Sequence, residues 1–259
     1  MKRLFAAILC LMLAPLGAHA DEKGDAVARK YFERTKAADT KAVATMTLVA
    51  KNGSKKVRKL EVNYQEGAQG KNAFIVFTDP ADIAGTKFLT LSKRGADADQ
   101  RLFLPALKKV RKISSSSKDG EFVNSDLFYY DMEERYLEDN TYTFLSDNET
   151  LADKAFAGMK FTKIAMKPTD PNAPYSKAVA WVNMANNFIY KMDCFDKKDG
   201  ALLKTILFVK VETIKGVLVP TQTLVSNVKK GTKTLMAMAN VQVNIGLKDD
   251  VFSVKNLEQ

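Results

Sequence analysis

The chain has 259 residues, of which 46% are hydrophobic and 27% charged, and its formal charge at pH 7 is +10. A chain of this length and composition can bury a large core as one domain. Its single histidine, His19, and one of its two cysteines, Cys10, precede residue 21. Residues 21–259 contain no histidine and one cysteine, Cys194. They therefore cannot form a catalytic triad built on histidine, a zinc site with histidine ligands or an internal disulfide bond.

The first 20 residues have the pattern of a secretory signal peptide. Lys2 and Arg3 precede an apolar run over residues 4–16, and residues 18–20 fit a cleavage site. The run is shorter than the roughly 20 residues that cross a membrane as a helix. We expect cleavage after Ala20 and a periplasmic protein, for which nucleic acid is not an expected partner. The positive charge either attracts anionic lipid headgroups or acidic partners, or belongs to an ordinary solvated exterior.

Hydrophobic spacing predicts one helix followed by many antiparallel strands. Apolar residues recur at helical spacing over residues 21–38, and after Asp39-Thr40 they alternate with polar residues, which is typical of strands. Turn signals such as Asn52-Gly53 join the strands as hairpins. The predicted strands cover residues 45–50, 60–64, 72–78, 86–93, 99–104, 142–145, 159–167, 177–183, 188–195, 201–214, 217–228 and 232–245.

The strand pattern favours one continuous sheet. Residues 132–140 are acidic and fit a short helix or a loop, and residues 249–252 fit a closing helical turn. Because consecutive hairpins place each strand beside the next, they build a large antiparallel sheet, and a sheet with this many strands tends to curl. The last strand alternates most cleanly and is expected to point these apolar residues to one face: Leu235, Ala237, Ala239, Val241, Val243 and Ile245.

Residues 99–131 carry the most informative pattern. The strand at 99–104 ends at Pro105, which has no N–H to donate to a neighbouring strand. Residues 114–120 are typical of an exposed turn rich in serine, and the apolar residues after it indicate a mobile flap. Before this turn lies a basic cluster that either contacts a headgroup or an acidic partner, or charges a sheet edge against strand addition: Lys108, Lys109, Arg111 and Lys112.

Three patterns in the sequence bear on catalysis or metal binding. Ser115 and Lys118 fit the S-x-x-K motif of penicillin-binding enzymes, but its companion motifs S-D-N and K-T-G do not follow. Cys194 lies in an alternating strand and fits a small core residue rather than a nucleophile. Paired acids such as Asp249 and Asp250 lack the spacing of a calcium-binding loop. The sequence therefore predicts neither an enzyme nor a bound metal or cofactor.

Residues 100–131 resemble the central motif of a bacterial family, the LolA/LolB-like outer-membrane lipoprotein-sorting proteins. That motif runs Q-W-L-Y-L-P-A-L, then K-V-R-R-I-S-S-S, then S-F-M-G-S-D-F-x-Y-E-D. The sequence departs from this motif at four positions. Arg101 replaces tryptophan, Phe103 replaces tyrosine, Asn124 replaces glycine and Tyr130 replaces an acidic residue. Asn124 can keep the turn, because asparagine tolerates the left-handed backbone region. Weaker matches lie at residues 79–86, 174–177 and 246–252, and the matching motif residues are Gln100, Leu102, Leu104, Pro105, Ala106, Leu107, Lys109, Val110, Arg111, Ile113, Ser114, Ser115, Ser116, Phe122, Ser125, Asp126, Tyr129 and Asp131.

The resemblance implies a mainly β fold with some helix, in which a large curved antiparallel sheet forms an unclosed half-barrel covered by helices. It also implies one carrier domain over residues 21–259, which binds lipid or lipoprotein acyl chains and passes them from an inner-membrane transporter to the outer membrane. Each methylene moved out of water is worth about 0.8 kcal/mol, so a chain of about 16 carbons is worth roughly 13 kcal/mol. Such a chain needs an apolar cavity whose lid opens.

On this interpretation, the flap and two strand methionines form the gate and the cavity: Phe122, Leu127, Phe128, Tyr129, Met236 and Met238. Lys109 and Arg111 would contact a headgroup or a partner protein. Members of the family occur beside export pumps of the resistance-nodulation-division (RND) type, which implies such a pump as partner of a monomeric carrier. The alternative is an envelope interaction module with a filled core, which docks a pump and carries no cargo.

Overall fold

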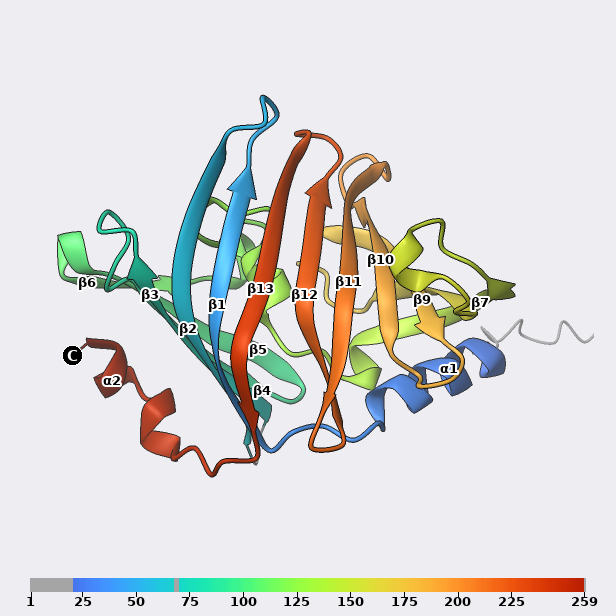
Figure 1. Cartoon of the computed structure of the whole chain (residues 1–259), viewed down its shortest axis with the longest axis horizontal. Helices are drawn as coiled ribbons and strands as arrows, with labels where there is room; N and C mark the ends of the chain where they lie inside the picture. Colours follow the sequence, from blue (N-terminus) through green and yellow to red (C-terminus); the bar gives the residue numbers. More distant parts are fainter. Residues whose placement is uncertain (1–20, 68–69, 259) are drawn as a thin grey trace, which may run out of the picture.

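The computed structural model describes residues 21–67 and 70–258. The expected signal peptide and its cleavage after Ala20 lie outside the described residues. Within them, thirteen strands form one antiparallel sheet, whose outermost strands, β6 (Lys109–Ile113) and β7 (Asn140–Glu149), do not pair with each other. The predicted unclosed sheet is confirmed, and Figure 1 shows it curling away from the viewer at both sides.

Two meanders of neighbouring strands make up the sheet, and they meet where β1 pairs with β13. Each predicted strand is present, and β6 is an additional strand at the edge. Beside β6, the first meander contains β1 (Asp39–Val49), β2 (Lys55–Gly67), β3 (Gly70–Asp79), β4 (Lys87–Lys93) and β5 (Ala96–Leu104). Beside β7, the second contains β8 (Phe161–Pro168), β9 (Tyr175–Asn183), β10 (Ile189–Asp196), β11 (Leu202–Ile214), β12 (Val217–Asn227) and β13 (Thr232–Val243).

The connection between the two edge strands runs back across one face of the sheet. We call residues 114–139 the crossing segment and the face that it covers the inner face. Phe122 and Tyr129 of this segment pack in one cluster with Met46 of β1 and Leu60 of β2. The segment is green in Figure 1 and lies behind the central strands. It contains only short 3-10 helices, at Ser115–Ser117, Phe122–Asn124, Tyr129–Met132 and Leu137–Asp139.

Helix α1 (Glu22–Phe32) covers the other part of the inner face, against β7 and β8. Asp21 caps the helix, because its carboxylate accepts hydrogen bonds from the backbone N–H of Gly24 at 3.0 Å and of Phe144 at 2.6 Å. A Cβ on Gly24 would lie 2.8 Å from the backbone nitrogen of Phe144, so glycine permits this close approach of helix to strand.

The expected cover of helices is therefore only partly present. Of the two α-helices in the described residues, α1 alone lies on the inner face, and irregular chain covers the rest. The second, α2 (Val254–Glu258), follows the predicted turn at Asp249–Phe252 and packs on the outer face against Phe74 and Leu89. The predicted helix at residues 21–38 is too long, since α1 ends at Phe32.

The predicted alternation along the last strand is wrong beyond Ala239. Asn240 adopts a left-handed conformation with φ 54°, and the register between β1 and β13 shifts at this point. Such a bulge inserts one residue and reverses the facing of the side chains that follow. Met236 and Met238 before the bulge and Val241 after it therefore pack with the same inner-face cluster, whereas Ala237 points to the outer face.

No helix in the described part of the chain has both the length and the apolar character needed to cross a membrane.

Candidate ligand-binding cavity

A cavity of about 390 Å³ lies on the inner face, between the central strands, the crossing segment and the end of α1. Met46 of β1 and Met236 of β13 are direct neighbours across the seam between the two meanders, and both line the cavity. Methionine adapts its shape to irregular partners, which suits a site for flexible apolar ligands. The volume lies within the range of about 300–1,000 Å³ that is usual for ligand sites.

The structure brings four of the six predicted apolar site residues to this cavity: Phe122, Leu127, Met236 and Met238. Tyr129 packs against Phe122, with ring centroids 6.0 Å apart, and against Phe88, which also contacts Phe122. Phe128 points away from the cavity and stacks on Tyr175, with ring centroids 6.0 Å apart. Phe128 and Tyr129 therefore support the crossing segment without lining the cavity.

Asp126 fastens the crossing segment to the sheet. Its carboxylate accepts hydrogen bonds from the hydroxyls of Thr232 at 2.5 Å and Thr234 at 2.7 Å, both on β13. Its backbone N–H donates to the hydroxyl of Thr234 at 2.9 Å. The two bonds with Thr234 are buried and the bond with Thr232 is partly buried, and together they tie the expected mobile flap to the middle of the sheet.

Lys204 of β11 provides a second anchor and is completely buried. Its ammonium donates to the backbone oxygen of Asp126 at 2.6 Å, forms an ion pair with Asp131 at 3.0 Å and lies 3.4 Å from the ring centroid of Phe128. The hydroxyl of Tyr175 donates to Asp131 at 2.6 Å. Burial, with the charge of Asp131, raises the pKa of Tyr175 well above its ordinary value, so the phenol keeps this proton.

Burial likewise raises the pKa of Cys194, and the thiol packs in the core beside these groups. Lys204 was not singled out by the sequence, because lysines occur in most of the strands. The available signal was its spacing: Lys204 shares the face of β11 with the apolar residues Ile206 and Phe208.

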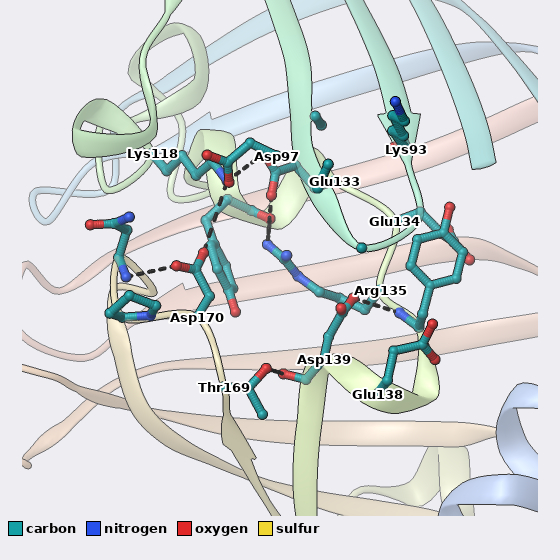
Figure 2. A pocket seen from close by; sticks show the side chains of 18 residues that line it. Lys93, Asp97, Lys118, Glu133, Glu134, Arg135, Glu138, Asp139, Thr169 and Asp170 are labelled. Carbon is teal, nitrogen blue, oxygen red and sulfur yellow. Dashed lines mark hydrogen bonds and ion pairs between the residues drawn. The ribbon is translucent and has the colours of Figure 1, made fainter. Parts of the chain in front are cut away.

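A second, polar cleft of about 500 Å³ lies on the far side of the crossing segment and is shown in Figure 2. Lys118 is 3% exposed, and its ammonium lies 2.6 Å from Asp97, 3.3 Å from Glu133 and 3.9 Å from Asp170. Arg135 pairs with the other oxygen of Glu133 at 3.0 Å. The predicted exposed turn at residues 114–120 is therefore wrong at Lys118, because three carboxylates compensate the burial of its charge.

The S-x-x-K pattern has no catalytic geometry in this cleft. The hydroxyl of Ser115 and the ammonium of Lys118 both donate to Asp97. Burial alone would lower the pKa of Lys118, but the hydrogen bond to Asp97 and the charge of Glu133 raise it. A lysine held in its charged form cannot accept a proton from serine.

The mouth of the apolar cavity carries another set of charges. Glu134 pairs with Lys36, which follows α1, at 3.2 Å and with Lys71 of β3 at 3.3 Å. Burial alone would raise the pKa of Glu134, but these two ammonium groups lower it. Ser92, Glu133 and Glu134 line both the cavity and the polar cleft, so they form the wall between the two.

The basic cluster lies apart from both pockets, on and beside the edge strand β6. Lys109 and Arg111 are exposed there, among the unpaired backbone groups of the edge. Charged side chains at such an edge hinder the addition of another strand. The position fits that interpretation, and contact of Lys109 and Arg111 with a headgroup or a partner stays a prediction.

No cluster of cysteine, aspartate and glutamate side chains suited to a metal ion occurs in the described residues.

The unclosed antiparallel sheet, with one segment across its inner face, has a LolA-like fold, which is that of an outer membrane lipoprotein-sorting domain. A family model described as "Uncharacterized protein" matches residues 69–259, and the chain belongs to this family. No curated protein matches the sequence.

Solved structures support this assignment over nearly the whole chain. A domain from Vibrio parahaemolyticus, named for outer membrane lipoprotein sorting, is 28% identical, with a TM-score of 0.85, over 92% of this chain and 99% of that one. A DUF1329 family protein from Desulfovibrio piger is 27% identical, with the same TM-score and the same coverage. A LolA superfamily protein from Nitrosomonas europaea, 19% identical with a TM-score of 0.69 over 90% of this chain and 98% of that one, shares the fold.

Proposed function

We propose that the protein is a periplasmic carrier that holds lipid or lipoprotein acyl chains in the inner-face cavity. The observation that carries this proposal is the apolar space of about 390 Å³ bounded by Met46, Met236, Phe122 and Leu127. Each methylene that enters it is worth about 0.8 kcal/mol. The relative from Vibrio parahaemolyticus, with its name drawn from lipoprotein sorting, supports the same class of cargo.

Release then requires the cavity to open or an acceptor to offer equal shelter to the chain. Asp126 and Lys204 tie the crossing segment to the sheet, so we place the opening at the mouth near Lys36 and Lys71 rather than at the expected flap. We further propose that residues 21–259 act as one domain that takes cargo from an RND-type inner-membrane transporter and passes it towards the outer membrane.

Native mass spectrometry of protein prepared from the periplasm tests the proposal directly. Co-purified lipid, and binding of a fluorescent fatty acid, are the expected results. A protein that is empty and binds no probe contradicts the carrier.

A variant that fills the cavity sharpens this test. Ala73 of β3 lines the cavity, and Ala73→Phe places an aromatic ring in it. Because the ring occupies space that the probe would fill, we expect probe binding to be about tenfold weaker or lost. A tenfold loss of affinity corresponds to about 1.4 kcal/mol. The matched control is Ala239→Phe on the exposed outer face of β13, which should bind like the unaltered protein. Urea unfolding of both variants separates loss of binding from loss of fold.

One observation favours the alternative, an interaction module without cargo. The buried bonds of Asp126 and Lys204 hold the crossing segment in one position, as in a filled core. In that case the pump partner would bind to Ala73→Phe as well as to the unaltered protein, and neither protein would carry lipid.

A further inference from the structure

Arg34 stands at the mouth of the apolar cavity in a fixed orientation. It follows α1 and lines the cavity, half-buried. The central carbon of its guanidinium lies 4.1 Å from the ring centroid of Tyr31 and 5.1 Å from that of Phe188. Its Nη1 donates to the backbone oxygen of Tyr31 at 2.5 Å. Contacts with two aromatic rings and one carbonyl hold the planar group beside the apolar space.

The charge of Arg34 has no acidic partner within ion-pair distance among the described residues. Apart from Glu66, the acids that line the cavity are engaged elsewhere. Glu134 pairs with Lys36 and Lys71, and Asp39 accepts from the backbone N–H groups of residues 245–247. Asp131 pairs with Lys204, and Glu133 pairs with Lys118 and Arg135. Glu66 is exposed at the rim, on the side of Lys71. A guanidinium has five N–H donors, and one of them is used.

We propose that the cargo is an anionic amphiphile, whose carboxylate or phosphate end binds to Arg34 while its chain lies between Met46, Met236 and Leu127. This inference rests on the proposed carrier function and names the class of cargo. Arginine suits the role because its planar fork binds both oxygens of such a group and stacks on aromatic rings, which lysine cannot reproduce.

Four probes with the same chain of twelve carbons test the proposal: dodecanoate, dodecyl phosphate, dodecan-1-ol and dodecylamine. Each is titrated against a neutral fluorophore bound to the full-length protein. We expect the two anions to bind about tenfold or more tighter than the alcohol, as a charge-assisted hydrogen bond allows. The amine should bind most weakly, because its charge repels Arg34.

Variants assign this preference to Arg34. Arg34→Leu should bind the anions as weakly as the alcohol, and Arg34→Lys should keep only part of the preference. Arg29→Leu is the control, because Arg29 is exposed on α1 and does not line the cavity. An unaltered preference for anions in Arg34→Leu overturns the proposal.

The remaining outcomes separate this proposal from the carrier function. Equal binding of all four probes to the unaltered protein overturns the anionic cargo and leaves the carrier in place. Binding of none of them overturns both. Inorganic phosphate serves as the probe for a free anion. If inorganic phosphate binds as tightly as dodecyl phosphate, the alkyl chain contributes nothing to binding. The proposal of an amphiphilic cargo is then overturned in favour of a free anion.

Discussion

The apolar cavity and the polar cleft share a wall, yet they use their charges in opposite ways. In the cleft, Lys118 and Arg135 are paired with carboxylates that the protein itself supplies. The cavity is largely apolar, and Arg34 at its mouth has no such partner. The charges of the cleft already satisfy one another, whereas the guanidinium of Arg34 keeps free N–H donors that a ligand in the apolar cavity could bind. Whether a charge already has a partner within the protein therefore distinguishes the candidate ligand site from the cleft.

The largest effect is expected from removing the Lys204 anchor, which holds the crossing segment on the sheet beside both pockets. Lys204→Met leaves the buried carboxylate of Asp131 without its counter-ion, and we expect a loss of about 3–5 kcal/mol in the free energy of unfolding. Urea denaturation measures it.

The matched control for this prediction is Lys210→Met on the same strand. Lys210 is exposed and pairs only with the exposed Glu212, so its loss should be small. Equal losses in the two variants would show that the buried anchor does not hold the crossing segment.

The two neighbouring glutamates of the wall give a prediction of intermediate size, because their pKa values shift in opposite directions. In the folded protein the pKa of Glu134 lies below its ordinary 4.5, so its contribution is present above that value and is lost as pH falls through the folded pKa. Burial raises the pKa of Glu133, against Arg135 and Lys118, so its contribution is present below 4.5 and is lost as pH rises through the folded pKa.

Unfolding curves between pH 3 and pH 7 measure this difference. We expect Glu134→Gln to cost about 1 kcal/mol at pH 7 and progressively less as the pH falls. Relative to the unaltered protein, Glu133→Gln should gain stability as the pH rises from 4 to 7. The same trend in both variants would contradict the assigned environments.

The smallest expected effect is at the sheet edge, away from both pockets. Replacing Lys109 and Arg111 together by threonine should change stability by about 0.5 kcal/mol or less, because both side chains are exposed. If these charges protect the edge, the variant should self-associate, and light scattering against concentration detects this. A variant that stays monomeric but loses binding to anionic vesicles would instead support the headgroup contact.

The alternation of apolar residues and the turn signals were sufficient to predict the twelve longer strands, and the match at residues 100–131 identified the class of fold. Local pattern could not reveal that Lys118 is buried, and for Lys204 it offered only the alternation with Ile206 and Phe208 on β11. Their carboxylate partners lie far away in the sequence, Asp131 being 73 residues from Lys204, and a lysine in a strand is usually solvated. Asn240 reversed the facing of the last strand, since a bulge depends on pairing between strands.

The cavity itself could be predicted only in part. Met236 and Met238 were identified by residue type, and Phe122 and Leu127 by their place after a turn. Arg34 was not recognised, because its significance arises only when α1 brings it beside Phe188, which is distant in the chain.

The seam between β1 and β13 determines the order in which the protein can be completed. These two strands lie side by side in the middle of the sheet, although β1 is the first and β13 the last strand of the described sequence. During synthesis from the amino terminus, β1 can pair with β2 as soon as β2 has formed. The other edge of β1 stays unpaired until the final hairpin, β12 and β13, is complete. Pairing of such distant segments is slow. Formation of the sheet therefore ends at its centre, and a chain released before the last hairpin has formed would expose the unpaired edge of β1 to other chains.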